Sequence, residues 1–559
     1  MIAVFAVIGV FGIRLVDIQL VRADELNAQS AEKRAQERTV YGVRGDIVDT
    51  NGSVLAGSVE RYDINASPRV ALGMDGGLEA ATEHVTEVAA ITGGDVTALM
   101  TELLDDPESD FMYLAKGVTL EEFRAVMELD IPWVTRDLRP SRVYPNGAIA
   151  GNIVGFEGTD GPQAGMELSA RDCLDSTNGT TTFERSLDNV MIPGSQITVE
   201  EAEDGGTLHL TIDRDLQFAV QQRLIQAAQQ LGATWATAIV QRVSDGHLMA
   251  VADYPTVDPN HITDPASTGS RAFAIPYEPG STIKSLTAAS LLDAGVAKPT
   301  TQITAPGRLY LSDGSFIKDA WAHGDINYTL AGALVNSSNT GISVLSDRLD
   351  AESRRDYLVG FGLNDETEVH FDGESEGSVH PVDEWDERTS YNVQFGQGMT
   401  TTSVQVASAY QAIANGGVRM PVTLVEGCEQ PDGTMTQVPS GEGTRVVSES
   451  AANATVAMLE GVVKKNDNFA VPGYRVAVKT GTGEVAENGV YTDKRVISSA
   501  GMAPADDPQY VVVVTLGIPG SMYGSSAVAT TFRDIMAQTL KTFRVTPSTE
   551  SAPQIPLTW

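Results

Sequence analysis

Three short segments contain residue types that together could carry out acyl transfer on a serine hydroxyl. They are Ser281-Thr-Ile-Lys284, Ser337-Ser-Asn339 and Lys479-Thr480-Gly481-Thr482. A serine hydroxyl is a weak nucleophile until a neighbouring base removes its proton. The segments offer two lysines as base and cation, and an asparagine amide that could hold a substrate. Because no C-x-x-C motif or Cys/His cluster accompanies them, we expect neither a metal nor a cofactor.

The spacing of a single motif is weak support, because the same spacing occurs elsewhere in the chain. Ser-x-x-Lys is also found at Ser30-Ala-Glu-Lys33 and at Ser315-Phe-Ile-Lys318. Ser281 differs from these decoys because a Pro-Gly pair precedes it and a run of helix formers follows it. We therefore predict Ser281 at a helix N-terminus, where free amides favour an oxyanion, with Lys284 one turn further on the same face. Taken alone, Ser281 would be an ordinary helix cap, and the order of the three motifs overrides that interpretation.

The two lysines have separate predicted roles. A lysine with a pKa of about 10.4 is neutral in about one molecule in 2,500 at pH 7, so its neutral form costs about 4.6 kcal/mol. Burial and a second cation both lower a lysine pKa. We predict that Lys284 accepts the proton of Ser281 and that Lys479 stays charged and attracts a substrate carboxylate. The alternative for Lys479 is a surface lysine at a strand end, which is less consistent with the adjacent Gly481 that lets a ligand approach the backbone.

The other motif residues are candidates for proton relay and substrate contacts. Ser337 would pass a proton to the leaving amine, and Asn339 would bind a substrate amide through both ends of its side chain. The backbone N–H groups of Ser281 and Thr482 would form an oxyanion hole, in which one donor is worth about 10²–10³ in rate. Taken alone, Ser337 and Asn339 would be a helix cap and a turn residue.

The elements that must position these motifs indicate an antiparallel sheet with helices packed on it. An Asp245-Gly246 turn between two alternating stretches predicts a hairpin. Three strand-like runs lie near the end of the chain: YRVAVKT, which contains Lys479, then RVISSAGMA and QYVVVVTLGI. A last helix would present one apolar face. That face contains Phe532, Ile535, Met536, Leu540 and Phe543.

The chain has 559 residues, which is long enough for two or three domains. We expect an α+β multidomain protein in four parts. They are a membrane-anchoring helix at 1–21, a stalk and pedestal domain at 22–205, a catalytic domain at 206–545 and a flexible tail at 546–559. The predicted boundary between the two large domains is the acidic, glycine-rich hinge near Glu203-Asp204-Gly205-Gly206.

The first residues, MIAVFAVIGVFGI, form an apolar run that Arg14 interrupts. These thirteen residues are fewer than the roughly 20 that span a bilayer. Neither a basic n-region nor a small-x-small cleavage site supports a signal peptide, so we favour a membrane anchor over a buried helix. The missing basic flank cannot orient such an anchor and leaves open whether the chain starts further upstream.

The net charge of −36 argues against two classes of partner. A surface this acidic repels nucleic acid and anionic lipid, so we expect neither. The two cysteines, Cys173 and Cys428, lie far apart in the sequence, and the sequence leaves open whether they pair.

Beyond the motifs, nearly the whole chain resembles the class B penicillin-binding proteins, most closely the septal, division-type D,D-transpeptidases. The resemblance includes RGDIVDTNGSVLA, SRVYPNGAIAGNIVGF, YEPGSTIKS, AWAHG, VNSSNTG, NVQFGQGMTTTSVQVASAY and VAVKTGTGE. Penicillin-binding proteins and class A β-lactamases share the ordered motif set. Thr50 stands where members of the family usually have Arg, and their basic cytoplasmic segment before the anchor is missing here.

The resemblance implies a single-pass protein of the cell membrane with an extracytoplasmic catalytic domain and a non-catalytic, elongated α/β dimerisation pedestal. Its penicillin-binding transpeptidase domain would have a five-stranded antiparallel sheet flanked by helices, with an all-helical lobe. Ser281 would be acylated by a stem pentapeptide ending in D-Ala-D-Ala, release D-alanine and pass the stem to an acceptor amine. Thr480, Gly481 and Thr482 would help Lys479 hold the terminal carboxylate. Implied partners are peptidoglycan stems, β-lactams, the membrane, a polytopic glycosyltransferase and divisome proteins.

Several rival functions share parts of this pattern. A serine β-lactamase has the same site but needs neither pedestal nor anchor, and a penicillin-sensing receptor would carry several membrane spans. A scaffold without catalysis would not need the intact motif residues, and a class A bifunctional synthase would need a glycosyltransferase domain before the pedestal. The main alternative to a septal enzyme is an elongation-type transpeptidase, and the AWAHG and FGQG surroundings favour the septal one.

Overall fold

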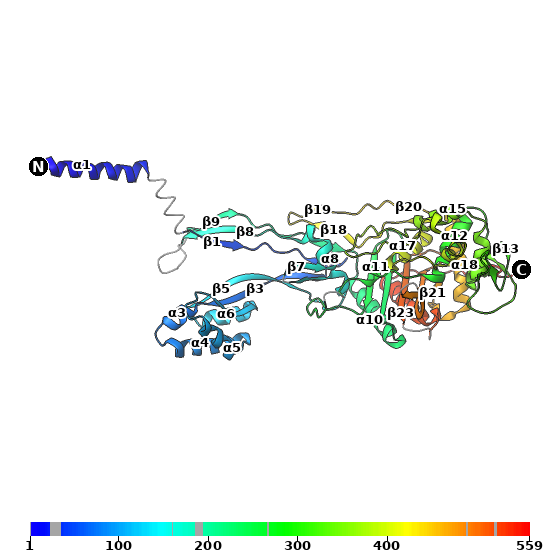
Figure 1. Ribbon diagram of the computed structural model, residues 1–559, viewed down its shortest axis with the longest axis horizontal. Coiled ribbons are helices and arrows are strands. Elements are labelled where there is room, and N and C mark those ends of the chain that lie inside the picture. The colour runs from blue at the N-terminus through cyan, green and yellow to red at the C-terminus, as the bar shows by residue number, and fades with distance from the viewer. Residues whose placement is uncertain are drawn as a thin grey trace. The chain divides into compact units, whose positions relative to one another are not determined.

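The computed structural model describes residues 2–22, 35–158, 160–184, 194–264, 268–487, 490–518 and 523–559. The chain divides into two compact units, whose helices and strands are labelled in Figure 1. The pedestal unit contains Met1–Gly45, Gly57–Val143 and Leu174–Gly206. The catalytic unit contains Asp46–Ala56, Tyr144–Cys173 and Thr207–Trp559.

This division corrects the predicted pedestal at 22–205, because segments 46–56 and 144–173 belong to the catalytic unit. The first of these segments contains β2 (Ile47–Val48), which pairs in parallel with β10 (Thr207–Leu210). The sequence does not indicate the pairing of this strand with a partner so distant along the chain. The second segment is tied to the catalytic unit by a disulfide that is described below.

The pedestal unit contains two small antiparallel sheets and a group of helices. One sheet is formed by β1 (Ala35–Val40), β8 (Gly179–Glu184) and β9 (Ile197–Glu200). In the other, β3 (Val54–Ala66) pairs with β4 (Met112–Val118) and β5 (Val134–Val143). The helices are α3 (Pro68–Gly73), α4 (Gly77–Thr92), α5 (Val96–Asp105) and α6 (Leu120–Glu128). Buried apolar side chains of β3, β4 and these helices form one core.

The first described element is the apolar helix α1 (Ile2–Val16), followed by one π-helical turn at Asp17–Val21. Its large side chains, including Phe5, Phe11 and Ile13, are exposed. Among the described residues, no helix combines the length and the apolar character needed to cross a membrane.

The catalytic unit contains a five-stranded antiparallel sheet in the order β12-β11-β23-β22-β21. The strands are β11 (Trp235–Arg242), β12 (Leu248–Tyr254), β21 (Ala477–Glu487), β22 (Val490–Ala503) and β23 (Tyr510–Ile518). The predicted hairpin turn at Asp245-Gly246 joins β11 to β12, and Gly246 adopts a φ of +76°. Lys479 lies on β21, at the edge of the sheet, where one side of the strand is free to meet another segment.

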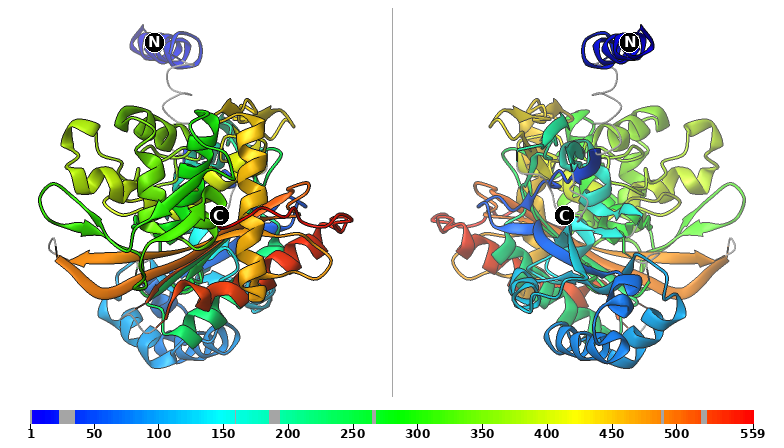
Figure 2. Two further views of the ribbon diagram at one scale, coloured as in Figure 1. Left: turned by 90° about the vertical axis from the view of Figure 1, so that its right-hand side faces the viewer. Right: turned by 90° about the vertical axis from the view of Figure 1, so that its left-hand side faces the viewer.

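Helices cover both faces of this sheet. On one face, α10 (Arg214–Leu231) contacts α19 (Ala529–Thr542), which buries the predicted apolar side chains from Phe532 to Leu540. The other face carries α17 (Ser403–Ala414) and α18 (Glu449–Lys465). Figure 2 shows α19 in red and α18 in gold on opposite sides of the orange strands.

A lobe next to the sheet contains α12 (Lys284–Asp293), α13 (Leu330–Val335), α14 (Asn339–Ser346) and α15 (Ala351–Gly360). We expected this lobe to be entirely helical, and it is not. Two short antiparallel pairs lie in the same stretch of chain: β13 (Gln302–Ala305) with β16 (Ile326–Thr329), and β14 (Leu309–Tyr310) with β15 (Phe316–Ile317). These strands are short, and the sequence between the helices carries no strong alternation that would predict them.

The segment 546–559 lies against the catalytic unit, so the prediction of a flexible tail is wrong. The backbone N–H of Thr329 donates to Leu557 O at 3.0 Å, and its hydroxyl donates to Pro556 O at 2.6 Å. The indole N–H of Trp559 donates to Ile303 O at 3.1 Å. A segment rich in proline and serine forms little secondary structure of its own, but its carbonyl groups can still bond to a distant strand.

Cys173 on α9 (Arg171–Leu174) and Cys428 on β18 (Val425–Glu429) form a disulfide within the catalytic unit. Their Cα atoms are 5.9 Å apart, and the bond joins residues separated by 255 positions. The disulfide therefore attaches the segment 144–173 covalently to a strand of the catalytic unit.

Replacing both cysteines, Cys173→Ser with Cys428→Ser, should lower the free energy of unfolding of the catalytic unit by about 2–5 kcal/mol. The physical reason is that the bond restricts the unfolded chain, and the restriction disappears in the variant. Urea unfolding followed by tryptophan fluorescence measures the change. A reductant should shift the wild-type midpoint and leave that of the variant unchanged. Identical wild-type midpoints with and without reductant would contradict the expectation.

Candidate active site

Ser281 lies in a single 3₁₀ turn, η3 (Gly280–Ile283), that leads directly into α12. Gly280 adopts a φ of +58°, a conformation that side-chain-bearing residues rarely adopt. A Cβ atom at Gly280 would lie 2.3 Å from Thr482 O, and Gly481 makes a similarly close approach to the turn. Glycines on both segments thus let the serine turn touch β21, which brings Ser281 next to the Lys-Thr-Gly motif.

Lys284 is the first residue of α12, and its side chain is completely buried. Its Nζ donates to Ser281 Oγ at 3.1 Å and to Asn339 Oδ1 at 2.6 Å. It also donates to the carbonyl oxygen of Ser337 at 2.6 Å and lies 3.3 Å from Ser337 Oγ. One lysine nitrogen therefore contacts the nucleophile candidate and both polar residues of the second motif.

The electrostatic surroundings favour the neutral form of Lys284. Burial lowers the pKa of Lys284 well below its usual value, and the nearby charge of Lys479 lowers it further, while Asp319 acts in the opposite direction. Burial also lowers the pKa of Lys479 to about 7, with a smaller contribution from Lys465. A group with this pKa is charged in about half of the molecules at pH 7. The predicted permanent charge on Lys479 therefore requires a negative group beside it.

Ser337 lies between the two lysines, in the link from α13 to α14. Its Oγ accepts from Lys479 Nζ at 3.0 Å and lies 3.3 Å from Lys284 Nζ. Its φ is +58°, which is uncommon for a residue with a side chain and is often found at functional sites. This backbone conformation presents both the carbonyl oxygen and the hydroxyl of Ser337 to Lys284.

Asn339 begins α14, and its position depends on Asp319, which the sequence did not single out. The buried carboxylate of Asp319 accepts from the backbone N–H groups of Asn339 at 2.6 Å and Thr340 at 3.0 Å. The side-chain amide of Asn339 donates to Lys318 O at 3.0 Å, which turns its Oδ1 toward Lys284. The decoy Ser-x-x-Lys segment that ends at Lys318 thus supplies a backbone acceptor and no nucleophile.

His323 contacts the second carboxylate oxygen of Asp319, the one that does not bond to Asn339. Its Nε2 lies 3.1 Å from Asp319 Oδ2, and both side chains are buried. The only signal in the sequence was the pair of polar residues around the AWAHG segment. That signal does not tell which helix the pair contacts, because the partner helix begins some twenty residues later.

The structure brings the five predicted catalytic residues into one cluster and places the three substrate-binding candidates beside it on β21. Thr480 is half-buried, Gly481 is buried and Thr482 is exposed. The decoy Ser315 lies in the turn between β14 and β15, and its Lys318 is exposed. The other decoy, Ser30, lies outside the described residues.

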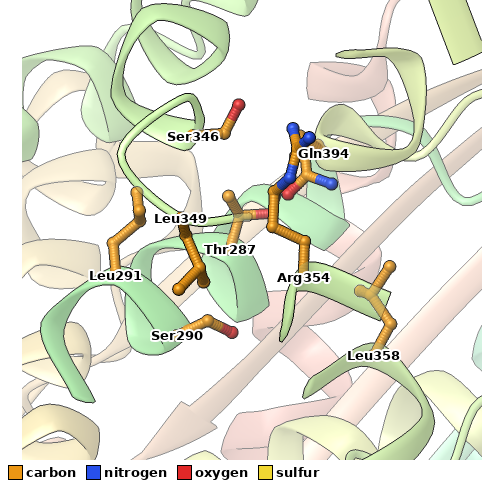
Figure 3. Close-up of a pocket in the computed structure, with 8 residues that line it drawn as sticks. All are labelled: Thr287, Ser290, Leu291, Ser346, Leu349, Arg354, Leu358 and Gln394. Carbon is orange, nitrogen blue, oxygen red and sulfur yellow. The ribbon is translucent and has the colours of Figure 1, made fainter. Parts of the chain in front are cut away.

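A small cavity of about 10 Å³ lies further along α12 (Figure 3). Its lining includes Thr287 and Ser290 of that helix, together with Arg354 and Gln394. The hydroxyl of Thr287 donates to Gln394 O at 2.8 Å, which attaches the segment containing Gln394 to the helix. None of the motif residues lines this cavity, so we do not assign it to the chemistry of the cluster.

The comparisons with known proteins confirm the resemblance that the sequence predicts. Residues 236–537 match the penicillin binding protein transpeptidase domain, and residues 39–163 match the penicillin-binding protein dimerisation domain. The chain is 32% identical to penicillin-binding protein PbpB of Mycolicibacterium smegmatis, covering 100% of this chain and 91% of that protein. It is 28% identical to peptidoglycan D,D-transpeptidase FtsI of Escherichia coli, covering 96% of this chain and 89% of that protein.

Among solved structures, it is similar to penicillin binding protein 3 of Mycobacterium tuberculosis complexed with aztreonam. The TM-score is 0.72 at 29% sequence identity, covering 93% of this chain and 100% of that chain. The similarity extends through both units, since the dimerisation and transpeptidase matches lie in different parts of the chain. The chain therefore belongs to the penicillin-binding protein family, with a dimerisation domain followed by a transpeptidase domain.

Proposed function

We propose that this chain is a serine-type peptidoglycan D,D-transpeptidase that acts in septal wall synthesis through an acyl-enzyme on Ser281. The observation that carries the proposal is the contact of 3.1 Å between Lys284 Nζ and Ser281 Oγ, made by a lysine that is completely buried. Burial lowers the pKa of Lys284, so the base is available in its neutral form near pH 7. The family of the chain supports the same reaction.

In the acylation step, neutral Lys284 accepts the hydroxyl proton of Ser281, and Oγ attacks the carbonyl carbon of the penultimate D-alanine in the donor stem. The new ester bond forms as the peptide bond to the terminal D-alanine breaks. The N–H groups of Ser281 and Thr482 would stabilise the oxyanion. The leaving amine nitrogen takes up a proton through Ser337, which contacts both lysines.

In the second step, the acceptor amine attacks the ester carbonyl of acylated Ser281. The amine nitrogen gives up a proton to Lys284, and the proton returns to Ser281 Oγ as the ester bond breaks. The new amide is the cross-link, and the enzyme regains its starting protonation. Asn339, held by Asp319 and Lys318, would bind the backbone amide of the stem in both steps.

Lys479 and the residues after it would bind the terminal carboxylate of the donor stem. Burial lowers the pKa of Lys479 to about 7, and a carboxylate placed beside the amine raises that pKa again. Substrate binding would therefore supply the negative group that keeps Lys479 charged. Thr480 and Thr482 would add hydroxyl donors, and Gly481 leaves room for the substrate against the strand.

The proposal also covers the location and the partners of the protein. The exposed apolar side chains of α1 are unfavourable in water, which supports residues 1–21 as an anchor in the cell membrane with the catalytic unit outside the cytoplasm. A polytopic glycosyltransferase and divisome proteins would be its partners. The assignment of a septal role, in preference to a role in elongation, rests on the sequences around AWAHG and FGQG. An elongation-type transpeptidase, or a scaffold of the divisome with minor catalysis, is the alternative.

A fluorescent penicillin should label the wild-type protein covalently and should not label Ser281→Ala, because the β-lactam carbonyl is attacked by Ser281 Oγ. Gel fluorescence after denaturation measures the label. Ser315→Ala is the matched control, since it alters a decoy serine, and it should be labelled like the wild type. Persistent labelling of Ser281→Ala would contradict the assignment. Rapid turnover of a chromogenic cephalosporin would indicate a β-lactamase instead.

The second-order rate constant of acylation should pass through a maximum at or below about pH 7. It should fall toward low pH because protonated Lys284 cannot accept the serine proton. It should fall above about pH 7 because Lys479 loses the charge that attracts the carboxylate. The constant is measured with a carboxylate-bearing β-lactam over a pH series. An acylating ester without a carboxylate should lose only the alkaline fall, and identical profiles for the two would contradict the role of Lys479.

A further inference from the structure

We propose that Glu278 is a positioning residue for acyl transfer, whose carboxylate holds the β21–β22 hairpin and the segment 396–398 against the serine turn. Glu278 lies three positions before Ser281 in the sequence, where Pro279 and Gly280 separate the two. The inference rests on the proposed function, because its effect is measured as acylation of Ser281.

The carboxylate of Glu278 contacts two separate segments around the serine turn. Its Oε1 accepts from the backbone N–H of Gly398 at 2.9 Å and from the hydroxyl of Tyr491 at 2.9 Å. Gly398 follows the 3₁₀ turn η5 (Val393–Phe395), and Tyr491 lies at the start of β22 in the β21–β22 hairpin.

The same segments meet the serine turn through backbone atoms alone, because their contact points are glycines. A Cβ atom at Gly483 would lie 1.9 Å from Glu278 O, and one at Gly396 would lie 2.1 Å from Gly280 O. Gly280 N–H donates to Gly396 O at 2.9 Å. Glycines permit this approach but add no side-chain contacts, and a glycine loses more conformational freedom than other residues when it is held in place. The side chain of Glu278 supplies the missing link between the segments.

Stability does not account for a carboxylate at this position. Burial raises the pKa of Glu278, and the charge of Glu484 acts in the same direction, so the charged form is disfavoured. Its Oε2 is buried without a hydrogen-bond partner in the part of the chain that the structure describes. A buried polar atom without a partner costs free energy. If the side chain at position 278 served only to fill space, a neutral side chain would make the protein more stable. The hydrogen bonds that Oε1 accepts are therefore the reason to infer that Glu278 has a role in the site.

The hairpin that Glu278 holds also carries the residues that would bind substrate. Lys479 to Thr482 lie on β21 a few positions before Glu484, in the part of the strand that touches the serine turn. A displacement of about 1 Å in a catalytic group can cost about 100-fold in rate. Loss of the Glu278 carboxylate should therefore slow acylation without abolishing it.

The experiment measures acylation by a fluorescent penicillin as two quantities, the first-order rate constant at saturation and the concentration that gives half of that rate. Glu278→Ala should lower the first-order constant by about tenfold to 100-fold, with the half-saturating concentration changed by less than about threefold. The final amount of label should remain one per chain, because the nucleophile and base are intact. Glu278→Gln should restore most of the rate, since its amide oxygen can accept the same hydrogen bonds.

Tyr491→Phe tests the contact from the other side, because it removes only the donating hydroxyl. The first-order constant should fall by about threefold to tenfold, and Glu278→Ala with Tyr491→Phe should be no slower than Glu278→Ala alone. Tyr310→Phe is the matched control, since Tyr310 is an exposed tyrosine whose hydroxyl makes no hydrogen bond to Glu278 in the described part of the chain, and its rate should equal that of the wild type.

Additive effects of the two substitutions would overturn the inference, as would an unchanged first-order constant in Glu278→Ala. A lower final amount of label with an unchanged rate constant would show a role in folding only and would also overturn it. If Glu278→Ala does not fold, Tyr491→Phe decides the question, because an unchanged rate in that variant removes the positioning role. Absence of label in the wild type, or persistent label in Ser281→Ala, would instead refute the proposed function.

Discussion

An amine that is removed from water holds its proton less tightly, and the site depends on this effect at Lys284. The nitrogen lies among the oxygens of Ser281, Ser337 and Asn339, and none of its hydrogen-bond partners in the described part of the chain is a carboxylate. If a carboxylate touched it directly, the lysine would stay charged and could not act as a base. Asp319 does not bond to Lys284 but accepts a hydrogen bond from the backbone N–H of Asn339, which does. Its charge raises the pKa of Lys284, and this effect is smaller than the lowering by burial and by Lys479. The contacts of α12, α14 and β21 thus bury one nitrogen, supply its hydrogen bonds and favour its neutral form.

The two lysines are chemically alike, but the substrate makes them different. Both are buried, and both have a lowered pKa. In the proposed reaction, the donor carboxylate would reach Lys479 from the part of β21 where Thr482 is exposed and would restore its charge. A charged Lys479 then lowers the pKa of Lys284 further. On this view, binding of the donor stem itself improves the base, because the carboxylate fixes the charge on one lysine and that charge favours the neutral form of the other.

The sequence predicted the features that depend on residues close together in the chain. It did not predict the features that depend on contacts between distant segments. The Pro-Gly break before Ser281 marked the helix start, and the strand-like run YRVAVKT placed Lys479 on a strand. Asp319 could not be assigned in the same way, because its partner Asn339 lies twenty residues away on an element whose direction only the fold determines. The same reason explains the tail, whose composition suggested flexibility although its carbonyl groups bond to Thr329. The disulfide between Cys173 and Cys428 could not be predicted either, because no sequence pattern relates two cysteines that lie 255 positions apart.

The interleaving of the two units has a consequence for the order in which the chain is made. Segments 46–56 and 144–173 leave the ribosome early but belong to a unit whose remaining part begins at Thr207. The thiol of Cys173 must wait for 255 further residues before Cys428 exists, which takes roughly 10 to 50 s of synthesis. During that interval β2 can pair with β3, and with β10 once Thr207–Leu210 has been made, but the segment 144–173 still lacks its covalent link to β18. A gene fragment cut at residue 206 would likewise separate the catalytic unit from a strand and from half of its disulfide.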